Sequence, residues 1–230
     1  MSESIAVRLA TVGARVESAS NRVGRPPESV FVVAVSKTWP ADVCLGAVEA
    51  GVAALGENRA QEFRDKYSVL KDRVPWHFVG HLQTNKVRHV VGAATLVHSV
   101  DRYGLAEAID KRARSLDIVQ DVLVEVNVSG ELTKNGIEPA RAEDLIDQIA
   151  PLSGVALRGL MTMPPMTPDP EDSRPYFKEL AAMRESIAER HPGLVELSMG
   201  MTRDFEVAIE EGATIVRIGE AIFGPRRPAP

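Results

Sequence analysis

Short apolar runs alternate with amphipathic segments along almost the whole chain. Residues 30–35 read VFVVAV, whereas residues 41–50 place their apolar side chains at helical spacing. A continuous apolar run of this length is typical of a strand that is buried on both faces, as strands of parallel sheets are. The pattern predicts eight strands, at residues 30–35, 52–58, 76–82, 95–101, 119–130, 155–163, 194–200 and 213–219.

Helical segments separate these strands, and one further amphipathic helix precedes them from Ser2 to Arg22. Strict alternation of strand and helix predicts a parallel sheet, and eight units in 230 residues favour closure. We therefore expect an α/β fold, namely a single (β/α)8 TIM-type barrel over residues 1–230 with an additional N-terminal helix. An open, doubly wound sheet is the alternative. The predicted connecting helices cover residues 40–50, 59–72, 84–94, 102–116, 139–152, 176–191 and 202–212.

Composition narrows the classes of function. Hydrophobic residues make up 44% of the chain, and the formal net charge is -5. A mildly acidic chain does not have the excess of positive charge that is typical of proteins that bind nucleic acid or an anionic membrane. The single cysteine, Cys44, cannot form an intrachain disulfide and is expected to be a core residue. Because no signal-peptide pattern and no apolar run of membrane-spanning length is present, we expect a cytoplasmic protein, and we expect a monomer.

Mostly polar residues follow the predicted strands, where a barrel builds its active site. These strand-end residues are Lys37, Glu57, Asn58, Gly80, His81, Ser99, Asn127, Met161, Ser198, Arg217 and Gly219. One interpretation is a metal-dependent hydrolase that uses His77 and His81 with Glu57. Two histidines without a firm third ligand make a weak metal site, so no metal is expected.

Lys37 follows the first strand directly, in the sequence AVSKTWP. Lysine is among the residues least often buried, so a lysine directly after an apolar strand either reaches solvent or has a chemical role, and the other residues at the mouth of the barrel distinguish the two. A lysine that is desolvated near a cation becomes a nucleophilic amine and forms imines with aldehydes. The alternative is a strand-end lysine whose ammonium group reaches solvent.

The segment SMGMTRDF, which begins at Ser198, has the properties of a phosphate site. Gly200 lets the backbone come close to a ligand, and Thr202 offers a hydroxyl group and a helix N-cap. Gly219 ends the eighth strand, and the loops after the seventh and eighth strands are the usual phosphate site of a barrel. The alternative is a plain glycine turn before a capped helix.

Arg217 alternates with Ile218 on the eighth strand, so its side chain is expected inside the barrel. A buried guanidinium has only donors and needs an acceptor. That acceptor is either the unprotonated nitrogen of a pyridine ring or a carboxylate such as Glu57 or Glu125.

A phosphate site, an imine-forming lysine and a donor to a ring nitrogen together indicate pyridoxal 5'-phosphate. The chain also resembles the pyridoxal phosphate homeostasis protein family over about residues 5–227. The motifs that carry the resemblance are AVSKTWP, GENRAQEF, WHFVGHLQTNK, HSVD, VNVSGELTKNG, GLMTM and LSMGMTRDFEVAIEEGATIVRIGEAIFG.

The resemblance implies a barrel like the N-terminal domain of alanine racemase, with Lys37 carrying the cofactor as an aldimine. It implies that Ser198, Thr202, Gly219 and the backbone of Met199 and Gly200 hold the phosphate. It also implies that Arg217 donates a hydrogen bond to the pyridine nitrogen and that Asn58 lies beside the ring. His81 and Met161 complete the predicted cofactor site.

The family is associated with vitamin B6 balance, so we expect storage, buffering or transfer of the cofactor, with apo-enzymes as possible recipients. No catalytic residue is assigned. The alternative is a small amino-acid racemase, which needs a second base on the opposite face of the substrate. The three tyrosines, Tyr67, Tyr103 and Tyr176, fall in predicted helices away from strand ends, so none of them is placed as that second base.

Lys134 is expected to be a solvated turn residue, and the proline-rich loop after Met163 is either a lid or a rigid surface loop.

Overall fold

The computed structural model describes residues 3–131 and 133–225 and contains a closed barrel of eight parallel strands in sequential order, which confirms the predicted fold class. Ser2, where we placed the start of the first helix, and residues 226–230 lie outside the described part. The strands are β1 (Phe31–Val35), β2 (Ala54–Glu57), β3 (Trp76–Phe78), β4 (Leu96–Val100), β5 (Gln120–Glu125), β6 (Val155–Met161), β7 (Glu196–Ser198) and β8 (Ile215–Ile218).

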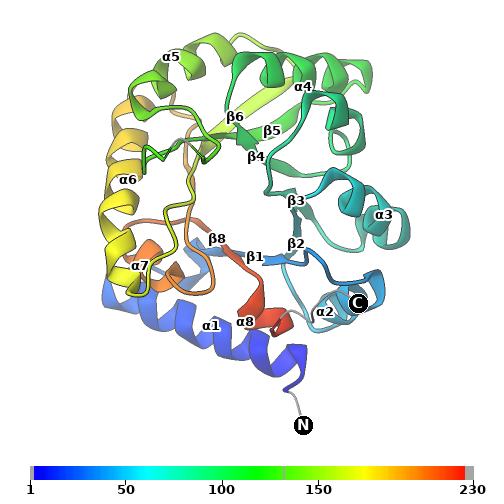
Figure 1. Cartoon of the computed structure of the whole chain (residues 1–230), viewed down its shortest axis with the longest axis vertical. Helices are drawn as coiled ribbons and strands as arrows, with labels where there is room; N and C mark the ends of the chain where they lie inside the picture. The colour runs from blue at the N-terminus through cyan, green and yellow to red at the C-terminus, as the bar shows by residue number, and fades with distance from the viewer. Residues whose placement is uncertain (1–2, 132, 226–230) are drawn as a thin grey trace.

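Helices surround the barrel in a ring that is seen along the barrel axis in Figure 1. The α-helices are α1 (Ile5–Arg22), α2 (Ala41–Glu49), α3 (Ala60–Leu70), α4 (Tyr103–Ser115), α5 (Pro139–Ile149), α6 (Arg174–Ala188), α7 (Phe205–Glu210) and α8 (Glu220–Phe223). Short 3-10 helices cover Pro27–Ser29 (η1), Lys71–Arg73 (η2), Thr84–His89 (η3) and Pro170–Ser173 (η4). No helix of the described residues combines the length and the apolar character needed to cross a membrane.

Two apolar clusters hold the fold together. The smaller one fills the barrel interior and includes Val33, Val35, Leu123 and Ile215, all of them buried. The larger one lies between the strands and the helices. Because both faces of each strand are covered, the strands carry the continuous apolar runs from which they were predicted.

The additional helix α1 closes the ring beside the short last unit. Helix α8 has only four residues, and α1 packs against both α7 and α8. Arg15 of α1 lies over the ring of Phe205 at 4.5 Å and forms two hydrogen bonds to Glu206. The N-terminal helix therefore covers a part of the barrel wall that α8 is too short to protect.

The structure departs from the predicted elements in two units. The segment after β3 forms the 3-10 helix η3 and not an α-helix over residues 84–94. Helix α7 begins at Phe205, after Asp204, so Thr202 is not its N-cap as predicted. In the first case β-branched residues disfavour a regular helix, and in the second a turn occupies residues 202–204.

Candidate functional site

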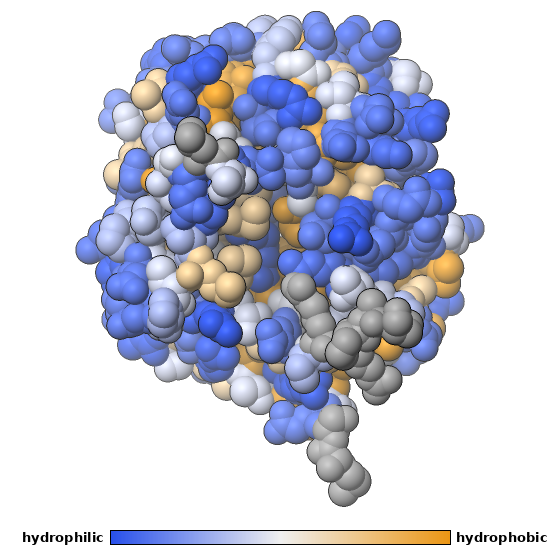
Figure 2. All heavy atoms as spheres, in the orientation of Figure 1, coloured by the Kyte–Doolittle hydropathy of each residue, from blue (hydrophilic) through white to orange (hydrophobic). Residues whose placement is uncertain are grey.

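A cavity of about 540 Å³ opens at the carboxyl ends of the strands. Apolar atoms gather around the middle of this face of the molecule, with hydrophilic ones around them (Figure 2). Met163, Met166, Thr167 and Pro170 of the proline-rich loop form part of the wall. The sequence-predicted residues that line the cavity are Lys37, Asn58, His81, Thr202, Arg217 and Gly219.

Lys37 reaches the cavity from a turn directly after β1. The next residue, Thr38, has a positive φ of 70°, which costs energy for a β-branched side chain. The turn is held at both flanks, because Trp39 N donates to Ser36 O over 3.0 Å and Thr38 N donates to Glu62 Oε2 over 2.8 Å. The surrounding contacts therefore fix the backbone on either side of Lys37.

A buried ion pair lies behind this turn, on the outer side of the barrel wall. Lys66 of α3 donates from Nζ to Ser36 O over 2.7 Å and also bonds Glu57 Oε1. Ser36 Oγ donates to the same Glu57 oxygen over 2.7 Å. Burial raises the pKa of Glu57 even though Lys66 and Ser36 oppose that rise. Lys66 was not singled out from the sequence, although it shares the buried face of α3 with Phe63 and Leu70.

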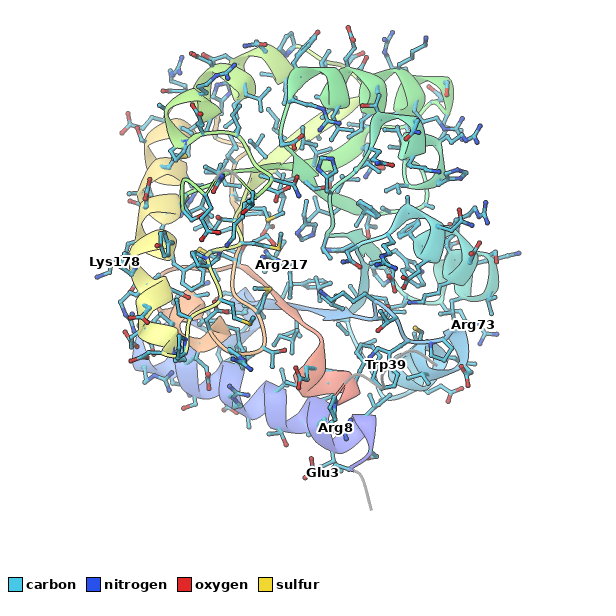
Figure 3. All side chains as sticks on the ribbon, in the orientation of Figure 1. Glu3, Arg8, Trp39, Arg73, Lys178 and Arg217 are labelled. Carbon is cyan, nitrogen blue, oxygen red and sulfur yellow. The ribbon has the colours of Figure 1, made fainter. Side chains whose placement is uncertain are left out.

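Arg217 is 3% exposed and points into the barrel, near the centre of the view in Figure 3. Its Nη1 donates to Ser198 Oγ over 2.6 Å, and its Nη2 donates to Thr162 O over 2.8 Å. Burial lowers the pKa of Arg217 to about 10, against the opposing charges of Glu125 and Asp204, so the side chain stays cationic at neutral pH. Arg217 also lines the cavity, where a guanidinium could donate to a ligand.

The alternative partner expected for Arg217 is a carboxylate. No ion pair within the described residues involves Arg217, and carboxylates act on its pKa only through their charge. Glu57 is instead bound to Lys66. Glu125 is 3% exposed and acts on Arg217 only through its charge, and its Oε2 has no hydrogen-bond partner among the described residues.

The turn after β7 provides donors for an anion. Gly200 has φ +89°, and a Cβ there would lie 2.6 Å from Ala208 Cβ, so only glycine fits. The amides of Gly200, Thr202 and Gly219 have no acceptor among the described residues, and Gly200 is buried. A buried amide without a partner indicates a bound acceptor. These donors and the Thr202 hydroxyl group fit a phosphate.

Two predicted phosphate residues are engaged elsewhere in this structure. The Met199 amide donates to Ile215 O over 3.1 Å, so it is not free to meet an anion. Ser198 is buried, and its hydroxyl group contacts Arg217 and His98. Asp204, and not Thr202, orders the turn, because its Oδ1 accepts from Met201 N over 2.7 Å.

Of the remaining predicted residues, Asn58 and His81 line the same cavity, whereas Met161 does not. Asn58 lines it, and its buried Oδ1 has no partner among the described residues, which suits a ligand that donates a hydrogen bond. Gly80 brings the backbone close to Asn58, since a Cβ there would lie 2.2 Å from Asn58 O. His81 lies at the rim with Nδ1 3.6 Å from Asp101 Oδ2, whereas Met161 is fully buried in the barrel interior.

The metal-hydrolase interpretation does not agree with the structure. His77 bonds His98, whereas His81 faces Asp101 and Glu57 binds Lys66. Within residues 3–131 and 133–225, no three His, Cys, Asp or Glu side chains come together as a possible metal site. Cys44 is a free, buried thiol whose pKa is raised by burial, which agrees with a core role.

Sequence reasoning also missed a row of buried polar groups that leads away from Arg217. Ser198 Oγ lies 2.8 Å from His98 Nδ1, and His98 Nε2 lies 2.9 Å from His77 Nδ1.

Lys134, expected in a solvated turn, is 27% exposed at its side chain and donates to Met163 O over 3.3 Å beside the cavity. Ser173 ties the proline-rich loop to Asp204 over 3.2 Å.

Chemically, one cavity presents an amine, a buried guanidinium and unpaired amide donors. The amine can condense with a carbonyl, the guanidinium can donate to an unprotonated ring nitrogen, and the amides can hold a phosphate. The residues present therefore fit a phosphorylated pyridine aldehyde.

Comparison with known proteins agrees with this chemistry. Residues 7–227 match the family model described as alanine racemase, N-terminal domain. A pyridoxal phosphate homeostasis protein of Aquifex aeolicus is 49% identical over 222 residues, covering 96% of this chain and 97% of that one. Another, of Vibrio cholerae, is 41% identical over 229 residues, with 97% of each chain covered. The structure of PipY of Synechococcus elongatus with PLP bound is 35% identical, with a TM-score of 0.83, and covers 96% of this chain and 100% of that chain.

Proposed function

Because this chain belongs to the family of pyridoxal phosphate homeostasis proteins, we propose that it binds pyridoxal 5'-phosphate in its cavity and takes part in vitamin B6 balance. The observation that carries the proposal is the meeting of Lys37, Arg217 and the turn after β7 around one cavity. The PLP-bound PipY structure, a relative over nearly the whole chain, supports it.

The proposal assigns the covalent link to Lys37. The Nζ amine attacks the aldehyde carbon, a carbon–nitrogen double bond forms, and the aldehyde oxygen leaves as water. The turn that carries Lys37 is held by Ser36 and by Glu62, so the amine starts from a fixed backbone. A fixed backbone means that only the side chain of Lys37 has to be ordered when the link forms.

The phosphate is assigned to the amides of Gly200 and Gly219 and to the hydroxyl groups of Thr202 and Ser198. Arg217 is assigned to the pyridine nitrogen. Since guanidinium has no acceptor atom, the ring nitrogen stays unprotonated, which weakens the ring as an electron sink. Asn58 and His81 are assigned to the edge of the ring, and Met161 supports the site from the barrel interior.

A weakened electron sink suits a protein that stores, buffers or transfers the cofactor. We propose that the protein works in the cytoplasm as a monomer and delivers the cofactor to apo-enzymes that need it. The cavity at the open end of the barrel supports this proposal, because a recipient enzyme or solvent can reach it from one side.

An absorption spectrum with chemical trapping tests the proposal. The purified protein, incubated with pyridoxal phosphate, should show a violet-absorbing band that borohydride removes, with the label on the peptide that contains Lys37. The Lys37→Ala variant should lose the band, while Lys134→Ala, which changes another lysine beside the cavity, should keep it. No band in the wild-type protein, or label on a different lysine, would refute the assignment.

A further inference from the structure

Four polar side chains form a continuous row through the barrel. Arg217 Nη1 lies 2.6 Å from Ser198 Oγ, Ser198 Oγ lies 2.8 Å from His98 Nδ1, and His98 Nε2 lies 2.9 Å from His77 Nδ1. Because β7 and β4 are not neighbouring strands, the Ser198–His98 bond crosses the interior. His77 ends the row, with its ring 5.5 Å from that of Phe31, the first residue of β1. We call these four residues the barrel-core chain.

Both histidines of the barrel-core chain are neutral at physiological pH. Burial lowers the pKa of His77 to about 4. Burial, then the charges of His77 and Arg217, lower the pKa of His98 well below its usual value. A neutral imidazole has one N–H donor and one acceptor nitrogen, so each histidine takes one of two tautomers.

The donors and acceptors admit only two complete arrangements. In one, Ser198 donates to His98 Nδ1, and His98 then donates from Nε2 to His77. In the other, His77 donates to His98 Nε2, and His98 donates from Nδ1 to Ser198. A mixture would bring two lone pairs or two hydrogens together at 2.8 or 2.9 Å, so the links change direction as one unit.

Ser198 decides between the two arrangements. Its oxygen already accepts from Arg217, and its own hydroxyl hydrogen needs an acceptor. Within the described residues, His98 Nδ1 is the acceptor that the structure offers. The opposite direction would leave a buried hydroxyl group unpaired, which costs about 1–3 kcal/mol. The ligand-free chain therefore points from Arg217 towards His77, and both histidines carry their proton on Nε2.

We propose that His98 and His77 are positioning residues for Arg217, and that their one-way hydrogen-bond chain fixes Ser198 so that it holds the guanidinium towards the cavity. Arg217 has a second hold at Thr162 O, but a single contact leaves rotation about the guanidinium plane possible. The contacts to Ser198 of β7 and to Thr162, directly after β6, together fix that plane. The consequence for the cofactor's ring nitrogen rests on the proposed function.

The first arm of the test uses ligand-free wild-type protein with ¹⁵N-labelled histidine. NMR couplings between ring nitrogens and carbon-bound hydrogens identify which nitrogen is protonated. We expect neutral, Nε2-protonated rings for His98 and His77 between about pH 6 and 8, with His77→Asn and His98→Asn used for assignment. A proton on Nδ1 of His98, or a charged ring for either histidine in that range, overturns the proposal.

The second arm compares His98→Asn with His98→Leu. The amide that His98→Asn introduces can accept from Ser198 through its oxygen or donate to Ser198 through its nitrogen, whereas leucine can do neither. With ¹⁵N-labelled pyridoxal phosphate, we expect wild-type protein and His98→Asn to give the same ring-nitrogen shift. His98→Leu should move that shift and weaken binding about tenfold, the effect of one lost hydrogen bond.

Equal shifts and affinities in all three proteins overturn the positioning role, provided that circular dichroism shows each one folded. If His98→Leu does not fold, the tautomers of the wild-type protein still decide. If the wild-type protein binds no pyridoxal phosphate, the proposed function fails while the first arm still tests the chain.

Discussion

The Nζ atom of Lys66 donates a hydrogen bond to the main-chain carbonyl of Ser36 over 2.7 Å, one residue before Lys37. A buried cation from α3 thus holds the backbone that presents the proposed cofactor lysine. Glu57 balances the charge of Lys66 on the same outer side of the barrel wall. The ion pair therefore connects the second barrel unit with the turn after the first strand.

Removing Lys66 should reduce stability and disturb Lys37 separately. We expect Lys66→Met to lower the free energy of unfolding by about 3–5 kcal/mol, since it leaves the buried Glu57 without a cation and with only the Ser36 hydroxyl group as a partner. The double variant Glu57→Gln with Lys66→Met should recover much of that stability. Both variants should form the imine at least about tenfold more slowly, because the bond to Ser36 O is lost in each. Denaturant titration and stopped-flow absorbance measure the two effects.

The exposed Lys111→Met on α4 is the matched control and should change neither quantity. If the double variant recovers both stability and the rate of imine formation, Lys66 serves folding only.

The barrel could be predicted because its signal is local. Each strand is buried on both faces and is bounded by a helix, so the alternation is visible in the printed sequence. The residues at strand ends followed from that alternation, and six of the ten predicted cofactor residues line the cavity. The sequence could not show that the Met199 amide donates to Ile215 O beside the pairing of β7 with β8, because that bond depends on register.

The barrel-core chain and Lys66 could not be found in the same way. His98 and Ser198 are separated by 100 residues and meet across the barrel, so no spacing connects them. Lys66 lies on the same buried face of α3 as Phe63 and Leu70. A charged residue on a buried face implies that it has a partner, but the sequence does not show which residue that partner is. Its acceptors come from two different strand ends.

The phosphate assignment predicts a difference between two ligands. Replacing Ser198 and Thr202 together by alanine should weaken binding of pyridoxal phosphate at least tenfold more than binding of pyridoxal. Charge-assisted hydrogen bonds are worth about 1.5–3 kcal/mol each. Isothermal titration with both ligands measures this, and Thr202→Ser, which keeps the hydroxyl group, should behave as wild type. Equal weakening of both ligands would assign the two hydroxyl groups to folding.

Phosphate binding should also reverse the barrel-core chain. If Ser198 turns its hydroxyl hydrogen to a phosphate oxygen, then His98 must donate to Ser198 from Nδ1, and His77 must donate to His98. We expect both histidines to change from Nε2–H to Nδ1–H when pyridoxal phosphate is added, but not when pyridoxal is added. ¹⁵N NMR of labelled histidine follows the change. Tautomers that stay unchanged at saturation would show that Ser198 acts through Arg217 and not on the phosphate.

Glu125 should make stability depend on pH. Burial raises its pKa to about 7, Asp101 adds to the rise, and Arg217 opposes it. A folded-state pKa above the usual 4.5 stabilises the protein fully below pH 4.5, and that stabilisation is lost as the pH rises through 7. His77 acts in the opposite sense, because its stabilisation is present above pH 6.5 and is lost as the pH falls towards 4.

Glu125→Gln removes the first of these two effects. Relative to wild type, the variant should gain up to about 3 kcal/mol between pH 4.5 and pH 8, as a pKa raised from 4.5 to about 7 implies. Urea unfolding of both proteins at pH 4.5, 6 and 8 measures the difference. A difference that does not vary with pH would mean that folding does not raise the pKa of Glu125.

The last prediction separates a carrier from a racemase. Inversion of an amino acid needs a base on each face of the bound substrate, and Lys37 can serve one face. Tyr67 donates to Asp72 over 2.9 Å, Tyr103 is 37% exposed at the start of α4, and Tyr176 lies in α6. None of the described residues that line the cavity is a tyrosine.

We therefore expect slow exchange of the α-proton of L-alanine and of other L-amino acids in deuterated water, without sustained formation of the D-isomer. A missing general base typically costs about 10²–10⁴ in rate. The proposed contact of Arg217 with the ring nitrogen would further weaken the electron sink, because it would keep that nitrogen unprotonated. NMR and chiral chromatography follow exchange and inversion, and Lys37→Ala should abolish both. Turnover to the D-isomer at about 1 per second or faster, an ordinary enzyme rate, would contradict the carrier function. Exchange without inversion would show that Lys37 acts alone on one face of the substrate.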